Sequence, residues 1–269
     1  MFNEDHKLIQ RMAPMLQRIL IVDPHPVGVT VLTDILRNIA RSQIWTAPSE
    51  PRGLALAKNV DPQLVFVEMS GPELDGCRFT RSLRRSHFAC RQAPVIMVTS
   101  TATAAGILGA RDAGVHEFLR KPFTTKDLLR RLEAVTLRPR DWIEAVSYVG
   151  PDRRRFNSGD YAGDLKRRSD TKATPDATRL IQAFKILKSA VAAIPRDPDQ
   201  ALRAMQAQAD DLQRLAAGMN DARLVEAAGT FGRYLRAAGL PLIAEEVAAQ
   251  AAPLLAMAPA EASQKSAAA

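Results

Sequence analysis

The chain has 269 residues, of which 46% are hydrophobic and 25% are charged, and these ordinary globular values argue against a disordered or fibrous protein. Two cysteines are too few for a disulfide framework, and no stretch approaches the roughly 18 consecutive apolar residues of a membrane span. We therefore expect a cytoplasmic protein without membrane insertion. The net charge is +8, and the basic excess lies before residue 176, because the remainder carries equal numbers of basic and acidic residues.

Strands and helices are expected to alternate through the first half of the chain. The expected strands are residues 18–23, 44–47, 64–67, 94–99 and 115–119. The expected helices are residues 27–40, 50–59, 74–86, 102–113 and 124–137. This alternation favours an α/β fold with a doubly wound parallel sheet.

Glu68 is expected to lie at the carboxyl end of the third strand. The apolar run at residues 64–67 is rich in β-branched side chains, as in a strand buried on both faces, and Glu68 follows it directly. Ser70, Gly71 and Pro72 then break the pattern, so the chain must turn. Open α/β sheets place ligands and chemistry at the carboxyl ends of their strands, which makes Glu68 a candidate site residue.

Four segments resemble the receiver domain of bacterial two-component response regulators. They are ILIVDPHP at the first expected strand, LVFVEMSGPELDG at the third, APVIMVTS at the fourth and GVHEFLRKPF at the fifth. The resemblance covers residues 18–137, with residues 1–17 as an N-terminal extension. It implies a flavodoxin-like, five-stranded parallel sheet in the strand order 2-1-3-4-5. It also implies a site where a histidine kinase phosphorylates an aspartate.

The resemblance assigns roles by position. Glu68 stands where the phosphoacceptor aspartate is usual, Asp23 matches the first acid of the usual pair, and Pro24 replaces the second acid, which contacts the metal directly. The remaining matches are the switch hydroxyl Thr99, the switch aromatic Phe118, the lysine Lys121 and the following Pro122, which usually has a cis bond. A divalent cation offsets repulsion between neighbouring carboxylates, so the loss of one acid predicts that neither Mg²⁺ nor another cofactor is needed.

These changes predict a pseudo-receiver. We expect a salt bridge from Glu68 to Lys121, with Thr99 drawn toward it, in an atypical response regulator that is not an enzyme. It would act in two-component signalling through protein partners, in a signalling or motility pathway, without conventional aspartyl phosphorylation. Two alternatives stay open at Glu68: a tolerated residue with no fixed state, or a regulator phosphorylated at an unusual site, with Ser70 or Thr99 as the acceptor.

Arginines suggest a further alternative, an effector of a cyclic dinucleotide. Residues 138–175 are expected to form a mobile basic linker, because Gly, Pro, Ser and Asp recur there without a sustained period. Candidate anion-binding residues are Arg78, Arg81, Arg84 and Arg85, on the solvent side of a helix, and Arg153, Arg154 and Arg155. Guanidinium groups suit phosphates, so cyclic di-GMP is one candidate ligand, although a solvated surface explains the same charges. No helix-turn-helix or zinc motif is present, so DNA binding is not expected.

Residues 176–257 are expected to form an all-α helical bundle. Apolar residues alternate in steps of three and four, as in a heptad seam, and Pro and Gly predict breaks near residues 195–198, 218–220 and 239–241. All four histidines precede residue 117, which excludes a histidine phosphotransfer bundle. We expect a docking or homodimerisation module, followed by a disordered tail at residues 258–269.

Overall fold

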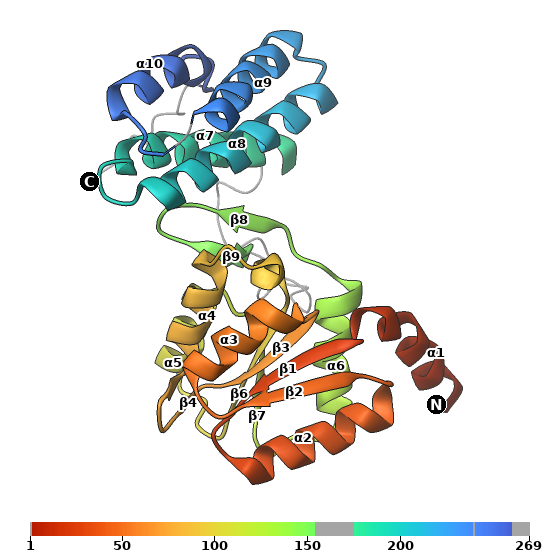
Figure 1. The fold of residues 1–269 in the computed structure, drawn as a ribbon. Coiled ribbons are helices and arrows are strands. Elements are labelled where there is room, and N and C mark those ends of the chain that lie inside the picture. The colour runs from red at the N-terminus through yellow and green to blue at the C-terminus, as the bar shows by residue number, and fades with distance from the viewer. Residues whose placement is uncertain (1, 154–174, 239, 260–269) are drawn as a thin grey trace, which may run out of the picture. The chain divides into compact units, whose positions relative to one another are not determined.

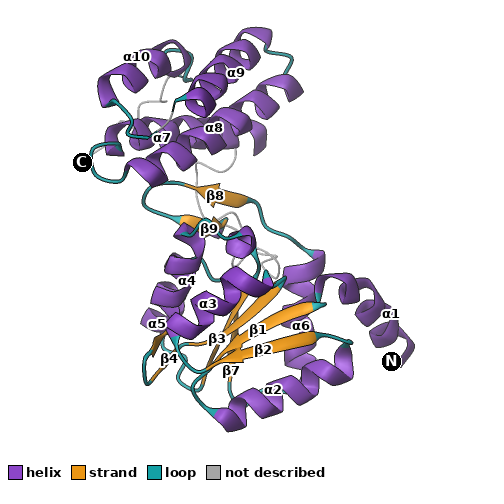
Figure 2. Ribbon diagram, in the orientation of Figure 1, coloured by secondary structure: helices purple, strands orange, loops and turns teal. Residues whose placement is uncertain are grey.

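The computed structural model describes residues 2–153, 175–238 and 240–259. These residues fall into two compact units. The α/β unit comprises residues 2–143 and 148–153, and the helical unit comprises residues 144–147, 175–238 and 240–259. Figure 1 follows the chain through both units, and Figure 2 separates helices from strands. No helix among the described residues combines the length and the hydrophobicity that crossing a bilayer requires.

The α/β unit is built on one parallel sheet of five strands. The strands are β1 (Arg18–Val22), β2 (Gln43–Ala47), β3 (Leu64–Glu68), β6 (Val95–Thr99) and β7 (Glu117–Arg120). Their order is β2-β1-β3-β6-β7, with every neighbouring pair parallel. This confirms the predicted order, since β6 and β7 are the fourth and fifth strands of the sheet. All five residues of β3 are buried, which explains why its sequence is a continuous apolar run.

Helices cover both faces of this sheet. The helices are α1 (Phe2–Met12), α2 (Pro26–Ile39), α3 (Glu50–Val60), α4 (Gly76–Arg85), α5 (Ala104–Asp112) and α6 (Thr125–Leu137). Side chains alternate along the strands, so Ile21 and Phe66 pack with α2 and α6, whereas Val22 and Val67 pack with α3, α4 and α5. Residues 1–17, expected as an extension, include α1 and a 3₁₀ turn, and Met12 and Leu16 are buried in the α2 and α6 core.

The stretch after α6 differs from the predicted linker. Residues 142–151 hold two short paired strands, β8 (Trp142–Glu144) and β9 (Val149–Pro151), and Tyr148 between them is buried. The Tyr148 hydroxyl donates a hydrogen bond to the Pro151 carbonyl over 2.6 Å. A Cβ at Gly150 would lie 2.7 Å from Gly114 Cα, so the backbones touch here and leave no room for a side chain. The expectation of a mobile linker is therefore corrected for residues 142–151, and residues 154–174 lie outside the described residues.

The helical unit contains the four helices that the sequence predicts. They are α7 (Pro175–Ala193), α8 (Pro198–Gly218), α9 (Ala222–Ala237) and α10 (Ala244–Leu255). Helix α8 packs on α7 and α9, and α10 packs on the same two helices, around a core that includes Leu187, Met205 and Phe231. The expected breaks are confirmed, because each lies at a junction of two observed helices, to within one residue. Residues 260–269, most of the expected tail, lie outside the described residues.

Residues 144–147 belong to the helical unit, although they precede the undescribed residues 154–174 in the sequence. Gln200 Nε2 donates to Glu144 Oε1 over 2.8 Å and to the Ala145 carbonyl over 3.2 Å. Gln208 Nε2 donates to the Glu144 carbonyl over 3.2 Å. Glu144 and both glutamines are buried, so these amides satisfy polar groups that would otherwise be costly to bury.

Candidate functional site

The candidate site lies at the carboxyl edge of the sheet. Asp23 follows β1, Glu68 ends β3, Thr99 ends β6 and Lys121 follows β7. Because the strands are parallel, their carboxyl ends meet at one edge and bring together residues that are far apart in sequence. The structure thus brings the expected acids and the expected lysine into contact at this edge.

Lys121 pairs with both buried acids. Its Nζ lies 2.6 Å from Glu68 Oε2 and 3.1 Å from Asp23 Oδ2. The side chains of Glu68 and Asp23 are each 7% exposed, and that of Lys121 is 26% exposed. Burial lowers the pKa of Lys121, but the hydrogen bonds and charges of Glu68 and Asp23 outweigh it, so this pKa is raised above its ordinary value. The ion pair between Glu68 and Lys121 that the sequence predicts is present.

The other two carboxylate oxygens also have donors. The backbone N–H of Met69 donates to Glu68 Oε1 over 2.9 Å. Asp23 Oδ1 accepts from the backbone N–H of His25 over 2.8 Å and lies 3.0 Å from the His25 ring nitrogen Nδ1. Each of the four carboxylate oxygens at this edge is therefore engaged by a donor of the protein itself.

These residues do not fit Mg²⁺, the ion that the resemblance implies. Mg²⁺ needs nearly ideal octahedral coordination by oxygen, whereas the cluster that could hold a metal combines two acids with an imidazole, Asp23, Glu68 and His25, within 4.8 Å of one another. Lys121 already forms ion pairs with both acids. The side chain of Pro24 offers no ligand, and a Cβ at Gly71 would lie 2.4 Å from Pro24 Cγ, so the residues after β3 pack closely on the proline.

The two residues at the expected switch positions, Thr99 and Phe118, have different surroundings. The Thr99 hydroxyl accepts from the Thr101 N–H over 3.1 Å and donates to the Thr101 carbonyl over 3.3 Å. This corrects the expectation that Thr99 is drawn toward Glu68, because a short turn after β6 already satisfies the hydroxyl. Phe118 is half-buried and packs on the core of α3 and α4. The peptide bond between Lys121 and Pro122 is cis, as the resemblance implies.

The prediction that Arg84 belongs to an exposed arginine surface is wrong. Arg84 was placed on the solvent side of its helix, but it is 1% exposed. The buried residues of α4 include Gly76, Thr80 and Arg84, which are four residues apart and so lie on one helix face. The Arg84 guanidinium donates to the carbonyls of residues 91, 93 and 114 and to His116 Nδ1. Burial lowers the pKa of Arg84 to about 9.

The other candidate arginines that the structure describes have different partners or are exposed. Arg78 Nε lies 2.6 Å from Glu50 Oε2, and Arg153 pairs with Asp112 over 2.8 Å on another helix. Arg81 and Arg85 are exposed on α4. Arg154 and Arg155 lie outside the described residues. Among the described residues of the expected anion-binding set, Arg84 is buried, and Arg78 and Arg153 form separate ion pairs. Arg81 and Arg85 are exposed.

The contacts of His25 with Asp23 were not predicted from the sequence. A signal was available, because an aspartate side chain often accepts a hydrogen bond from the backbone two residues later, and the motif Asp-Pro-His favours such a turn. The contact of Met69 with Glu68 was also missed. It depends on the rotamer of one glutamate, which no sequence pattern specifies.

Comparison with known proteins identifies a family over this unit. The family described as "Response regulator receiver domain" matches residues 19–133. Protein PilH of Pseudomonas aeruginosa is 31% identical over 118 residues, which are 44% of this chain and 96% of PilH. The transcriptional regulator RpaA of Synechocystis is 30% identical over 45% of this chain and 49% of its own length. Chemotaxis protein CheY-3 of Vibrio cholerae is 26% identical over 44% of this chain and 90% of its own length.

Some solved structures match part of this chain. A CheY-like receiver domain protein from Methanospirillum hungatei has 24% sequence identity and a TM-score of 0.41, and the match covers 45% of this chain and 94% of that one. The match with this chain covers about half of the length of RpaA and nearly all of the length of PilH.

Proposed function

The chain belongs to the response regulator receiver family, and we propose that its α/β unit is a pseudo-receiver, which signals through protein contacts without phosphorylation of an aspartate. The observation that carries this proposal is the short ion pair between Lys121 and Glu68, 2.6 Å long. In the family, that lysine pairs with phosphoryl oxygens. Here a carboxylate of the chain itself takes that place, so the lysine is satisfied without a phosphoryl group.

The chemistry of Glu68 supports this view. Glutamate is one methylene longer than aspartate, and its carboxylate reaches Lys121 while its second oxygen accepts from Met69. A phosphoryl group would bring about −1.5 to −2 charges and three acceptor oxygens, whereas glutamate brings one charge and two oxygens. The pair thus reproduces part of the charge of a phosphorylated site. Thr99 bonds to Thr101 instead, so the resemblance to that state does not extend to the switch hydroxyl.

No metal is needed for this function. With one cation between two acids, these three side chains carry a net charge near −1, and the cation offsets the repulsion between the carboxylates. The protein would act by binding, not by catalysis. Its partner would be a protein of a signalling or motility pathway, which the similarity to a protein named for chemotaxis supports. The helical unit would supply a second docking surface.

The test is the intact mass of the full chain after treatment with acetyl phosphate and Mg²⁺. We expect no added phosphate on the wild type. The Glu68→Asp variant shortens the side chain and frees space before Lys121, so gain of phosphate by this variant would indicate that the rest of the site still supports the chemistry. Glu73→Asp, an exposed change in the turn after β3, is the matched control and should behave as the wild type.

One result would overturn the proposal. Stoichiometric phosphate on the wild type would show that another group accepts it. Fragmentation of the labelled protein would then locate the phosphate, and Ser70 and Thr99 would be the first residues to inspect.

A further inference from the structure

Residues 144–147, the sequence Glu-Ala-Val-Ser, form a short non-helical segment of the helical unit. The buried hydrophobic core of this unit is drawn from residues 183–254. Val146 packs against that core, but it is only partly buried itself. The helices therefore build a core of their own, and the 144–147 segment binds to it much as a peptide ligand would.

Two buried amides of α8 hold the 144–147 segment. Gln200 and Gln208 are 0% and 3% exposed, and their spacing of two steps of four places them on the same side of the helix. Gln200 Nε2 donates to the Glu144 carboxylate over 2.8 Å and to the Ala145 carbonyl over 3.2 Å. Gln208 Nε2 donates to the Glu144 carbonyl over 3.2 Å. The groups that α8 binds are thus one carboxylate and two main-chain carbonyls.

Arg203 fixes which end of the Gln200 amide meets the segment. Its Nε and Nη2 atoms donate to Gln200 Oε1 over 3.2 and 2.9 Å. A guanidinium group can only donate, so the amide oxygen must face Arg203 and the NH₂ group must face Glu144. The site therefore selects a segment with acceptors at these positions, and the positive charge of Arg203 favours a carboxylate over a neutral side chain.

The polar character of these contacts makes the docking reversible. Release of the segment would expose Gln200 and Gln208 to water, which forms hydrogen bonds with both amides. The apolar contact that is lost is that of Val146, which is small because this side chain is only partly buried. A second segment with the same acceptors can therefore compete for the site.

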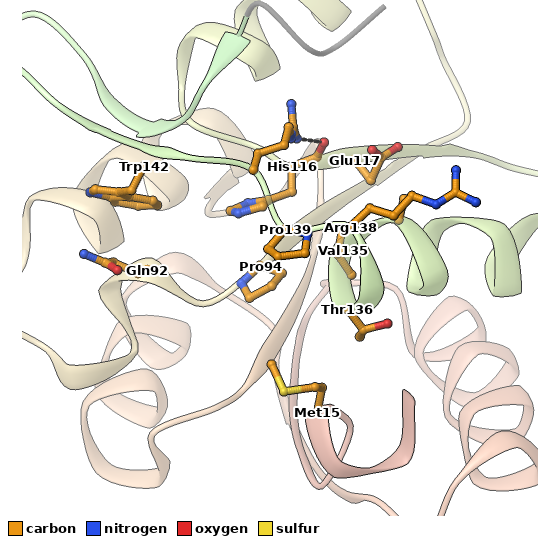
Figure 3. Close-up of a pocket in the computed structure, with 12 residues that line it drawn as sticks. Met15, Gln92, Pro94, His116, Glu117, Val135, Thr136, Arg138, Pro139 and Trp142 are labelled. Atoms are coloured by element: carbon orange, nitrogen blue, oxygen red, sulfur yellow. Dashed lines mark hydrogen bonds between the residues drawn. The ribbon is translucent and has the colours of Figure 1, made fainter. Parts of the chain in front are cut away.

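The hollow shown in Figure 3 has a different character. It measures about 250 Å³, and the residues that line it belong to the α/β unit. Arg138 in its lining pairs with Glu133 over 2.8 Å, and Glu117 pairs with Arg131 over 3.0 Å. Side chains of the same unit engage these charges, so the hollow indicates no charged ligand. On α8, in contrast, the buried donors are engaged by a segment that lies outside the four helices.

We propose that α8 carries a docking site for a non-helical peptide with a glutamate followed by small and β-branched residues, and that the 144–147 segment occupies this site in cis. A protein partner docks by presenting a similar exposed segment, which displaces the chain's own. This inference rests on the proposed function in one respect, since it names the docking surface of the helical unit. The two can fail separately, because the phosphate assay reports on Glu68 and the peptide assay reports on α8.

A labelled peptide tests the site in the full chain. The probe is a synthetic peptide of residues 141–149 with a fluorophore at its N-terminus, followed by fluorescence anisotropy. Glu144→Arg in the protein replaces an acceptor by a donor at the Gln200 amide, so it should release the chain's own segment. A tethered segment competes at an effective concentration of up to about millimolar, so we expect the peptide to bind this variant at least about tenfold more tightly than the wild type. Glu226→Arg, an exposed change on α9 with the same change in charge, is the matched control and should bind as the wild type does.

Further changes locate the peptide on α8. In the Glu144→Arg background, Gln208→Leu removes one buried donor and should weaken the peptide about tenfold. Gln250→Leu, on the exposed side of α10, should leave the affinity unchanged. A peptide in which glutamine replaces the glutamate should bind about tenfold more weakly, because a charged acceptor is lost.

Several results would overturn the proposal. They are no saturable binding of the peptide to Glu144→Arg up to millimolar concentration, equal affinity for this variant and the wild type, and equal losses in Gln208→Leu and Gln250→Leu. Circular dichroism and the unfolding temperature report whether Glu144→Arg keeps its helices. Loss of the helices would also contradict the proposal, because the 144–147 segment would then be part of the fold and not an exchangeable ligand.

Discussion

Two cations of the α/β unit, Lys121 and Arg84, have opposite kinds of partners. Lys121 lies between two carboxylates, and its pKa is raised, because hydrogen bonds and charges outweigh burial. Arg84 lies among carbonyls and an imidazole, and burial lowers its pKa to about 9. The first cation offsets acids at the edge where receivers carry their chemistry. The second donates to several backbone segments at once, so its role is structural. The comparison separates a cation that offsets two acids from a cation that holds loops together.

Removal of Arg84 should have the largest effect. Arg84→Met keeps an apolar stem but leaves the carbonyls of residues 91, 93 and 114 without this donor. Each buried group left unpaired costs about 1–3 kcal/mol, so we expect a loss of about 3 kcal/mol or more in the free energy of unfolding. Urea unfolding followed by tryptophan fluorescence measures it, because both tryptophans belong to the α/β unit.

The control for Arg84 is its exposed neighbour Arg81 on the same helix. Arg81→Met should change the free energy of unfolding by less than about 0.5 kcal/mol, as is usual for surface positions. Equal effects of the two substitutions would contradict the structural role of Arg84.

Removal of Lys121 should cost less, because its side chain is 26% exposed and water can enter. Lys121→Met leaves Asp23 and Glu68 facing each other without a cation, and we expect a loss of about 2 kcal/mol. A second substitution, Glu68→Gln, should recover part of this loss, because it removes one of the two facing charges. The exposed Lys126→Met is the control. Strictly additive effects of Lys121→Met and Glu68→Gln would mean that the two side chains are not coupled.

His116, which accepts a hydrogen bond from Arg84, should make the stability of the fold depend on pH. Its Nδ1 receives hydrogen bonds from Arg84 over 3.2 Å and from the Val95 N–H over 3.3 Å, so the folded state needs this nitrogen unprotonated. Burial, with the charges of Arg84 and Arg140, lowers the pKa of His116 well below 6.5. Below that pH the unfolded chain binds a proton that the folded chain does not. The stabilisation is therefore complete above pH 6.5 and is lost as pH falls from there toward the folded pKa.

The slope of this loss is about 1.4 kcal/mol per pH unit for one proton. Urea unfolding between about pH 5 and pH 8 measures it, a range above that in which Asp and Glu usually titrate. His116→Gln keeps an acceptor oxygen without a titrating ring and should flatten the profile, whereas the exposed His87→Gln should leave it unchanged. A wild-type profile without a slope below pH 6.5 would refute the link.

The carboxylate site was more predictable than the arginine cluster, for a physical reason. The apolar run before Glu68 predicted a buried strand that ends at a carboxylate, and parallel strands align such ends at one edge. The resemblance to receiver domains supplied the strand order and the roles of Asp23 and Lys121. Arg84 follows from helix phase, since it lies four residues after the buried Thr80, but a charged residue is usually assigned to solvent. The burial of Arg84 depends on carbonyls from distant loops, which no local pattern reveals.

The stretch after α6 shows a second limit of sequence reasoning. Gly, Pro and charged residues at short intervals favour a linker, yet residues 142–151 contain paired strands. The deciding contacts are the close approach of Gly150 to Gly114 and the guanidinium groups against the Trp142 ring. Both are long-range contacts, so they became visible only in three dimensions.

Substitution of Arg153, an exposed cation, should change the free energy of unfolding least. Its guanidinium lies 2.8 Å from Asp112 and 4.2 Å from the centroid of the Tyr148 ring, but its side chain is 43% exposed and that of Asp112 is 48% exposed. Solvent screens such a pair, so Arg153→Gln should lower the free energy of unfolding by about 0.5 kcal/mol or less, and salt should reduce even this effect. Arg111 also pairs with Asp112, which limits the loss further. A cost comparable to that of Arg84→Met would mean that the position of a cation in this unit, buried or exposed, does not decide its contribution.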